Sequence, residues 1–336
     1  RRIIGAMEYR TIPRTEITVS SIAMGCWGIA GGSMWGEQEE KDSIGAIHAA
    51  LDSGITFFDT AEAYGGGLSE EVMGKAFRGR REKAVIATKV SPSHFAAADL
   101  RQSCEASLKR LQTDYIDLYQ LHWPTRDETP LSETVEAAQA LIQEGKIRSF
   151  GVCNFGTGNM EDMLPLTVPV TNQVAYSLVW RAIEQEIVPQ CKEHGIGILP
   201  YSALLHGILS GKYRSADEVP DGRARTRHFS GDRPNARHGG PGAEELTFGI
   251  INQVASVCEE LGLTMTQVAF AWAMHKEQVT SVLAGARNAE QAEANAAIGD
   301  IELTDDVMTR LDEISRPMVT EFGTNADMWQ DPGRMK

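Results

Sequence analysis

Short apolar runs alternate with segments of helical periodicity along almost the whole chain. In the helical segments apolar side chains recur on one face, as at Ile44, Ile47 and Leu51. The runs with the length of buried strands are residues 21–25, 56–60, 84–90, 116–122, 147–152, 170–174, 195–202 and 279–285. Alternation of this kind predicts an α/β fold with a parallel sheet, and eight repeats favour a closed (β/α)8 TIM barrel over an open doubly wound sheet.

Motifs and flanking segments support a single barrel domain. An open sheet that binds a dinucleotide usually carries G-x-G-x-x-G after its first strand, and the nearest match here, GTGNME, ends in glutamate. Residues 8–20 are predicted to form an N-terminal β-hairpin, and residues 305–316 an extra C-terminal helix. No linker divides the chain, so residues 7–336 are predicted to be one domain. Residues 1–6 are interpreted as an added extension before a natural start at Met7.

Composition limits the partners and the compartment. The chain is 42% hydrophobic and 23% charged, and its formal net charge of −14 argues against general binding to nucleic acid or an anionic membrane. No apolar run approaches the roughly 20 residues that a membrane span needs. The five cysteines lie far apart, with no C-x-x-C pair and no histidine at metal-ligand spacing. We therefore expect no metal site and a reducing, cytoplasmic location.

Ionisable residues close three consecutive predicted strands. Asp59, Lys89 and His122 each stand at the carboxyl end of an apolar run. In a barrel these ends meet at the face that carries the active site. Lys89 can then pair with Asp59, which offsets the cost of burying either charge, and Tyr64 in the next loop can reach the same point. Each residue alone, above all His122, has an ordinary structural explanation. Together the four indicate a catalytic site.

These four side chains suit proton transfer to a carbonyl group. A nearby ammonium favours phenolate over phenol, so we expect the pKa of Tyr64 to be lowered and Tyr64 to act as a general acid. Asp59 would keep Lys89 charged, and a neutral His122 would orient the carbonyl oxygen. Reduction also needs a hydride, which no side chain donates, so the site is expected to bind a redox cofactor.

Seven motifs resemble the aldo-keto reductase family in order and spacing: FDTAEAYG, ATKV, LYQLHW, GVCNF, NQVAYS, YSALLHGILSGKY and VLAGARNAEQAEAN. The resemblance extends from about Arg10 to Arg316, and its branch includes bacterial aldo-keto reductases and potassium-channel β subunits. It implies a TIM barrel that binds an extended nicotinamide dinucleotide without a Rossmann unit. It also implies a catalytic tetrad, which is Asp59, Tyr64, Lys89 and His122.

The resemblance further implies a cofactor site along the barrel mouth. Asn154 and Gln173 would hold the nicotinamide carboxamide, and Tyr201 would stack on its ring. Arg287 matches the residue that meets a 2′-phosphate, which favours NADP(H), with NAD(H) as the alternative. Cys153 stands where the family more often has serine. The implied cofactor residues are Trp27, Asn154, Gln173, Tyr201, Ser202, Leu204, Lys212, Gly285, Arg287, Gln291 and Asn295.

A glycine- and proline-containing segment has the opposite charge to the whole chain. From Lys212 to His238 there are seven Lys and Arg residues and four acids. The resemblance places this segment over the cofactor pyrophosphate. Because it offers little to bury, we expect the segment from Lys212 to Pro241 to be mobile until the cofactor binds.

The predicted activity is transfer of a hydride from a nicotinamide cofactor to an aldehyde or ketone. Trp35 and Trp123, together with Trp27, are expected to form an apolar wall for this small-molecule substrate, although Trp27 can also simply pack against its own loop. Two other functions stay open: a nucleotide-sensing regulatory subunit like the potassium-channel β subunits, and an NAD-dependent sugar or polyol dehydrogenase. The physiological substrate, the reaction direction and the oligomeric state do not follow from the sequence.

Overall fold

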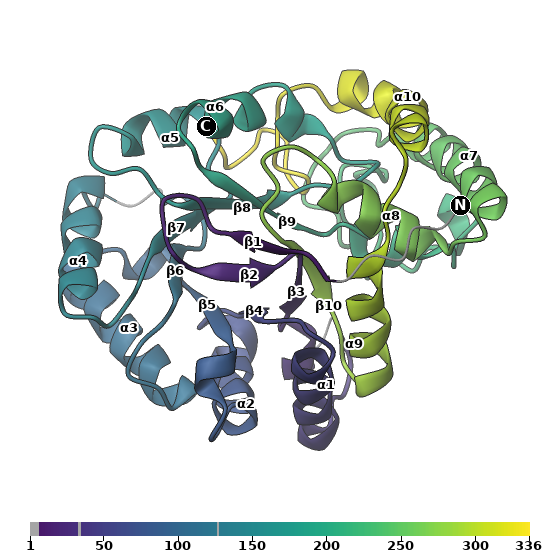
Figure 1. Cartoon of the computed structure of the whole chain (residues 1–336). Coiled ribbons are helices and arrows are strands. Elements are labelled where there is room, and N and C mark those ends of the chain that lie inside the picture. The colour runs from purple at the N-terminus through teal and green to yellow at the C-terminus, as the bar shows by residue number, and fades with distance from the viewer. Residues whose placement is uncertain (1–6, 33–34, 126–127) are drawn as a thin grey trace.

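The computed structural model describes residues 7–32, 35–125 and 128–336, so the predicted extension at residues 1–6 lies outside the described residues. Within them, eight parallel strands form the sheet in the order β10-β3-β4-β5-β6-β7-β8-β9 (Figure 1). A parallel bridge between Ile198 and Val279 joins the two ends of this order. The strands are β3 (Ile22–Gly25), β4 (Phe57–Asp59), β5 (Val85–Val90), β6 (Leu118–Leu121), β7 (Phe150–Cys153), β8 (Thr171–Ala175), β9 (Gly197–Tyr201) and β10 (Val282–Gly285). The predicted TIM barrel is confirmed.

Helices surround the barrel (Figure 1). They are α1 (Glu40–Asp52), α2 (Leu68–Ala76), α3 (Ala97–Leu111), α4 (Leu131–Gln143), α5 (Thr157–Met163), α6 (Ile187–Glu193), α7 (Glu244–Leu261), α8 (Met265–Met274), α9 (Ala289–Ala296) and α10 (Asp305–Phe322). In α3, for example, Leu100, Cys104, Leu108 and Leu111 are buried on one face, as their spacing predicts. The extra C-terminal helix is confirmed as α10, which continues to Phe322. No helix in the described part of the chain has the length and apolar character to cross a membrane.

The N-terminal hairpin closes one end of the barrel. It consists of β1 (Tyr9–Thr11) and β2 (Thr18–Ser20), which pair antiparallel, and it lies across the barrel in Figure 1. Its buried residues Ile12, Ile17 and Val19 belong to the same apolar cluster as the barrel-lining side chains. Burying such a side chain fully contributes about 1.5–3 kcal/mol. A binding site is therefore left to the opposite end, where the strands terminate.

Strand alternation carries polar side chains into that opposite end. Phe57, Ala87 and Leu118 form one layer of the apolar cluster inside the barrel. Because side chains two positions apart share a face of a strand, the next inward layer holds the residues two positions further along. These residues are Asp59, Lys89 and Gln120. The barrel interior thus changes from an apolar layer to a polar layer within two residues along each strand.

Candidate active site

A buried ion pair lies at the centre of the polar layer. The Lys89 ammonium donates to Asp59 Oδ1 at 2.5 Å and to the Thr60 carbonyl oxygen at 2.6 Å. Lys89 is 0% exposed and Asp59 2% exposed. Burial is the largest single effect and lowers the pKa of Lys89, but the carboxylate of Asp59, together with Tyr64 and Cys153, raises it by more in total, so the net shift is upward. Lys89 therefore stays protonated inside the barrel and pairs with Asp59, as expected from the positions of both residues at the ends of apolar runs.

A glycine turn places Tyr64 over this ion pair. The Tyr64 hydroxyl is 3.4 Å from Lys89 Nζ. The turn Tyr64–Gly67 contains three consecutive glycines with φ of 63°, 64° and 99°. Such values suit glycine, and a Cβ at Gly67 would meet the Arg110 side chain at 2.6 Å. The sequence YGGG thus lets the chain fold back so that the phenol faces the strand ends.

The imidazole of His122 completes the group. His122 follows β6, and its ring centroid is 5.7 Å from that of Tyr64, with the rings nearly perpendicular. Burial, together with the charge on Lys89, lowers the pKa of His122 to about 3. The ring is therefore neutral at ordinary pH, as expected, and can donate only through the nitrogen that carries a proton. The structure thus brings all four predicted tetrad residues together.

The expected pKa of Tyr64 was wrong in direction. Burial raises the pKa of Tyr64 to about 12, and the nearby charge on Lys89 lowers it by less than burial raises it. The charge of Asp59 also opposes Lys89. The phenol is consequently a weaker acid than expected, and it stays protonated throughout the neutral range.

The residues predicted for the nicotinamide end lie on three neighbouring strands. Tyr201 ends β9, and its hydroxyl donates to Asn154 Oδ1 at 2.7 Å. Asn154 follows β7 and donates from its amide to the His122 carbonyl oxygen. Gln173 lies within β8 rather than at its end, and its amide donates to Asp59 Oδ2 at 2.8 Å. These amides connect the predicted cofactor site directly to the tetrad.

Strained backbone follows β9, where the pyrophosphate residues were predicted. Ser202, Leu205 and His206 have φ of 55°, 44° and 54°, which non-glycine residues rarely adopt. Such strain tends to cluster at binding sites. Leu204 lies within this turn, whereas Lys212 is exposed and has its ammonium 5.6 Å from the Tyr213 ring.

The basic segment after β9 is better packed than expected. Ala224, Thr226, His228 and Phe229 are fully buried, and His228 Nε2 lies 2.8 Å from the Val179 carbonyl oxygen. The expectation that this segment offers little to bury was therefore wrong. The reason is that distant C-terminal residues pack against it: the Phe322 ring contacts His228, and the Arg227 guanidinium donates to the Asn325 carbonyl oxygen. Its mobility remains a prediction.

The residues predicted for the adenosine end lie at the end of β10, in the turn that follows it and along α9. Arg287 donates from Nε to Gln38 Oε1 at 2.7 Å and from Nη2 to the Glu37 carbonyl oxygen. Its backbone N–H donates to Gln291 Oε1. Asn295 donates to the carbonyl oxygen of Gly285, the last residue of β10. Arg287 is thus a half-buried guanidinium held in one orientation by a neighbouring loop.

The three predicted tryptophans fall into two groups. Trp27 stacks on Tyr64 with the ring planes inclined by 23° and centroids 5.8 Å apart, and it meets Trp35 edge-on at 5.4 Å. Trp123 instead contacts Trp329, and the guanidinium carbon of Arg334 is 3.6 Å from its ring centre. The predicted wall is therefore two separate aromatic groups around the tetrad.

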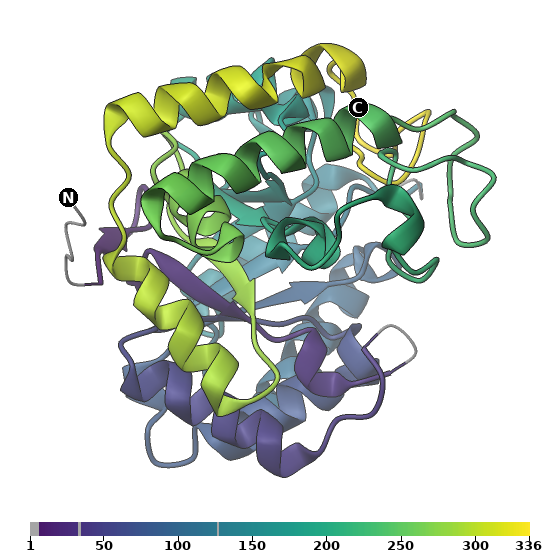
Figure 2. The same ribbon diagram turned by 90° about the vertical axis from the view of Figure 1, so that its right-hand side faces the viewer.

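The C-terminal tail contributes residues that sequence reasoning missed. Trp329 lies nearly parallel to Tyr201 with centroids 5.8 Å apart. Buried Asp327 binds Arg334, and the Arg227 N–H donates to the Met328 carbonyl oxygen. Figure 2 shows this tail, in yellow, at the end of the barrel opposite the hairpin. A tryptophan in a tail that is mostly polar was the signal that could have revealed it.

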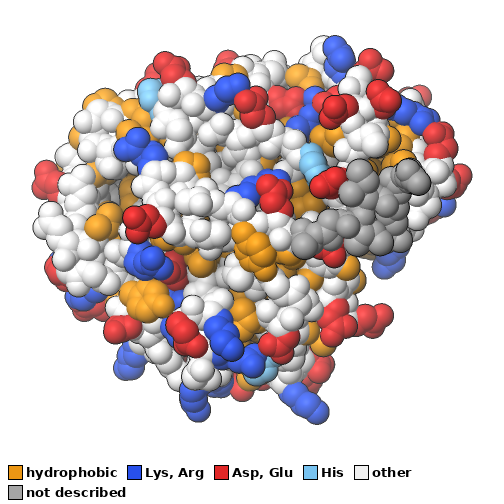
Figure 3. Space-filling view, in the orientation of Figure 1, with side chains coloured by type: hydrophobic (Ala, Val, Ile, Leu, Met, Phe, Trp, Pro, Cys, Tyr) orange, Lys and Arg blue, Asp and Glu red, His pale blue; other side chains and the backbone are white. Residues whose placement is uncertain are grey.

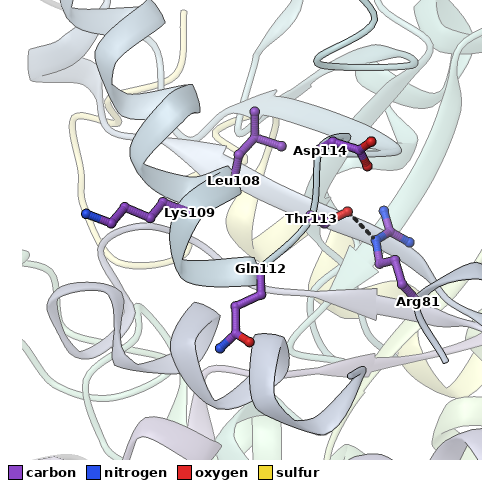
Figure 4. A pocket seen from close by; sticks show the side chains of 6 residues that line it. All are labelled: Arg81, Leu108, Lys109, Gln112, Thr113 and Asp114. Carbon is purple, nitrogen blue, oxygen red and sulfur yellow. Dashed lines mark hydrogen bonds between the residues drawn. The ribbon is translucent and has the colours of Figure 1, made fainter. Parts of the chain in front are cut away.

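An open hollow of about 570 Å³ lies away from this site. Its lining includes Arg81, Thr113 and Asp114, which precede β5 and β6 (Figure 4). It is therefore at the amino ends of the strands, the wrong end of a barrel for catalysis. The Arg81 guanidinium is already bound to the buried Asp117 carboxylate.

Solved structures of other proteins are similar to this chain in both fold and sequence. An aldo/keto reductase from Klebsiella pneumoniae, solved with NADP and acetate, has a TM-score of 0.72 and 31% identity over 91% of this chain and 95% of that one. A glycerol dehydrogenase from Gluconobacter oxydans has a TM-score of 0.78 and 31% identity over 94% and 96%.

Curated relatives cover nearly the full chain. The aldo-keto reductase YhdN of Bacillus subtilis is 36% identical over 94% of this chain and 97% of its own length. The NADH-specific methylglyoxal reductase of Escherichia coli is 31% identical over 90% and 97%. A probable voltage-gated potassium channel subunit beta of Arabidopsis thaliana is 28% identical over 92% and 96%. A profile of the Aldo/keto reductase family matches residues 21–316. This chain therefore belongs to the aldo/keto reductase family of oxidoreductases.

Proposed function

We propose that this protein is an NADP(H)-dependent carbonyl reductase in which Tyr64 is the general acid. The observation that carries the proposal is the position of the Tyr64 hydroxyl, 3.4 Å from a buried ammonium and beside a neutral imidazole. The side-chain amides of Asn154 and Gln173 and the aromatic ring of Tyr201 are a combination of hydrogen-bonding groups and a stacking surface that fits a nicotinamide. A bound nicotinamide dinucleotide would supply the hydride.

Each tetrad residue has a separate task in this proposal. Tyr64 donates its proton to the carbonyl oxygen, while the N–H of His122 orients that oxygen. Lys89 stabilises the phenolate that is left on Tyr64. Asp59 holds Lys89 in place and keeps the ammonium protonated.

The activity is tested by a panel of aldehydes, ketones and the matching alcohols with each dinucleotide. We expect carbonyl reduction with NADPH. The reaction is measured as the decrease in absorbance of the reduced nicotinamide. Alcohol oxidation with NAD⁺ alone would favour the polyol dehydrogenase alternative. Cofactor binding without turnover on any substrate would favour the regulatory subunit.

The surface favours an enzyme over a regulatory subunit. The large hydrophobic side chains that are exposed in the described residues come from separate elements, among them Tyr9 in β1, Ile142 in α4 and Leu261 in α7. On the face shown in Figure 3, charged and hydrophobic side chains are interspersed. A partner surface usually forms a contiguous apolar patch.

The rates of reduction and oxidation are expected to respond differently to pH. With a Tyr64 pKa of about 12, the phenol remains protonated as the pH rises, so single-turnover carbonyl reduction should be nearly flat between about pH 6 and pH 9. Alcohol oxidation needs the phenolate as a base. Its rate should therefore rise by up to about tenfold per pH unit over the same range. A reduction rate that falls with a midpoint near neutral pH would contradict this assignment.

Arg287→Ala is expected to weaken NADPH binding far more than NADH binding. A charge-assisted hydrogen bond to phosphate contributes about 1.5–3 kcal/mol, which corresponds to about a 10- to 100-fold change in Kd, and NADH has no 2′-phosphate. Fluorescence titration of both cofactors measures the difference. Because Arg287 also holds Gln38, Gln38→Ala is the control for loss of that contact. Equal weakening of both cofactors by Arg287→Ala would assign Arg287 a structural role.

A further inference from the structure

The second carboxylate oxygen of Asp59 has partners that the proton-transfer scheme does not use. Asp59 Oδ2 accepts from Gln173 Nε2 at 2.8 Å and from Gln120 Nε2 at 3.2 Å. Gln120 is 0% exposed. A carboxylate can only accept, so the amide must present its NH2 group to Asp59. Asp59 is thus bound on both oxygens, with Lys89 on Oδ1.

The barrel is shaped to receive the Gln120 side chain. On β6, Gln120 lies in register with Lys89 of β5 and with Gly151 of β7. A Cβ on Gly151 would approach the Gln120 side chain to 3.3 Å and Thr171 Oγ1 to 2.4 Å. The missing side chain at Gly151 therefore leaves the room that Gln120 needs. Gln120 Oε1 also accepts from Cys153 Sγ at 3.6 Å, so both ends of the amide are engaged.

We propose that Gln120 is a positioning residue for the reaction: its amide holds Asp59 Oδ2, so that Oδ1 faces Lys89 and Lys89 stays beneath the Tyr64 hydroxyl. Without this amide, Gln173 is the donor that still holds Oδ2, so the carboxylate is restrained from one side less and can shift about its last bond, and the ammonium shifts with it. A displacement of about 1 Å at a reacting group can lower a rate by up to about 100-fold. The proposal rests on the proposed function, because it assigns Gln120 a part in the same site.

The charges around Gln120 determine what a pH experiment can report. The ionisable groups that face this part of the barrel come from β4, β5, β7, the Tyr64 turn and the end of β6. They are Asp59, Lys89, Cys153, Tyr64 and His122. Burial raises the pKa of the Cys153 thiol, and the pKa of His122 is lowered to about 3, so both are neutral near pH 7. A new transition in this range would belong to a newly introduced group.

Gln120→Glu tests the proposal through such a transition. In its protonated form the new carboxyl group can donate to Asp59 Oδ2 as the amide does. As the pH rises it ionises beside a second carboxylate, and the repulsion displaces Asp59. We expect single-turnover reduction near the wild-type rate at low pH and a fall of about tenfold or more at high pH. The wild-type rate should show no such fall.

Gln120→Met is the second variant, because it keeps a similar volume and has no group to donate. We expect a rate about tenfold lower at every pH, with the Kd for NADPH within about twofold of wild type. Leu121→Met is the matched control on the same strand, since Leu121 packs in the cluster outside the barrel interior. Its rate and pH profile should be those of wild type. Circular dichroism checks that each variant is folded, and Gln120→Met decides alone if Gln120→Glu does not fold.

The outcomes separate this proposal from the proposed function. A wild-type protein that reduces no carbonyl would overturn the proposed function itself. An active wild type, with a Gln120→Met rate equal to that of wild type or a Gln120→Glu profile parallel to it, would overturn only the role of Gln120.

Discussion

Tyr64→Phe is expected to lower the turnover of carbonyl substrates by about 10²–10⁴, because it removes the proposed general acid. Cofactor affinity should be nearly unchanged. The phenylalanine ring keeps the contacts with Trp27 and His122, so the variant loses only the hydroxyl near Lys89. Single-turnover kinetics and fluorescence titration measure the two quantities separately.

The matched control for this variant is Tyr9→Phe. Tyr9 donates its hydroxyl to the Gly54 carbonyl oxygen at the hairpin end of the barrel, far from the tetrad. The Tyr9→Phe variant should therefore have the turnover of wild type. If Tyr64→Phe keeps turnover within about tenfold of wild type, the general acid is another group and the proposed mechanism is wrong.

Lys89→Met is expected to abolish turnover and to lower the free energy of unfolding by about 3–5 kcal/mol, because it leaves the carboxylate of Asp59 buried without its cation. The Thr60 carbonyl oxygen also loses a donor. Denaturant unfolding near neutral pH measures the loss. Adding Asp59→Asn removes the unpaired charge, so the double variant should regain part of the stability and none of the activity.

Lys75→Met is the control for loss of a lysine in an ion pair. Lys75 binds Glu40 at 2.6 Å, but both side chains are more than 40% exposed. Exposed pairs contribute about 0–1 kcal/mol, so this variant should unfold near the wild-type midpoint. If Lys89→Met unfolds there too, the Asp59 carboxylate without its cation does not have the expected cost in stability.

Strand periodicity explains why so much of the site was predictable. Side chains alternate across a strand and parallel strands end at one face, so the positions of Asp59, Lys89 and His122 at run ends were enough to bring them together. The three glycines after Tyr64 likewise indicate a turn that can reverse the chain direction. These are local rules, because each depends on spacing within a few residues.

Contacts between distant segments were not predictable in this way. The seven motifs locate Tyr201, yet nothing near it in sequence indicates that Trp329 lies parallel to its ring. The basic segment looked poor in apolar residues, but Phe229 is buried. The groups that cover a residue come from elements that are far apart in the chain. Contacts between such elements follow no fixed spacing in the sequence, so a sequence pattern does not reveal them.

The amino-acid order alone was sufficient for the barrel, its N-terminal hairpin and the identity of the four converging side chains, because backbone hydrogen bonding imposes those periods. The raised pKa of Tyr64 and the contacts on which the proposed role of Gln120 rests emerged only from the folded molecule. The sequence pattern indicates that Lys89 is near Tyr64. The pKa of Tyr64, however, depends on two opposing effects, stabilisation of the phenolate by the Lys89 ammonium and its destabilisation by loss of solvent, and the second depends on the depth of burial. That depth is a property of all the surrounding elements together, and here it raises the pKa that proximity to Lys89 alone would lower.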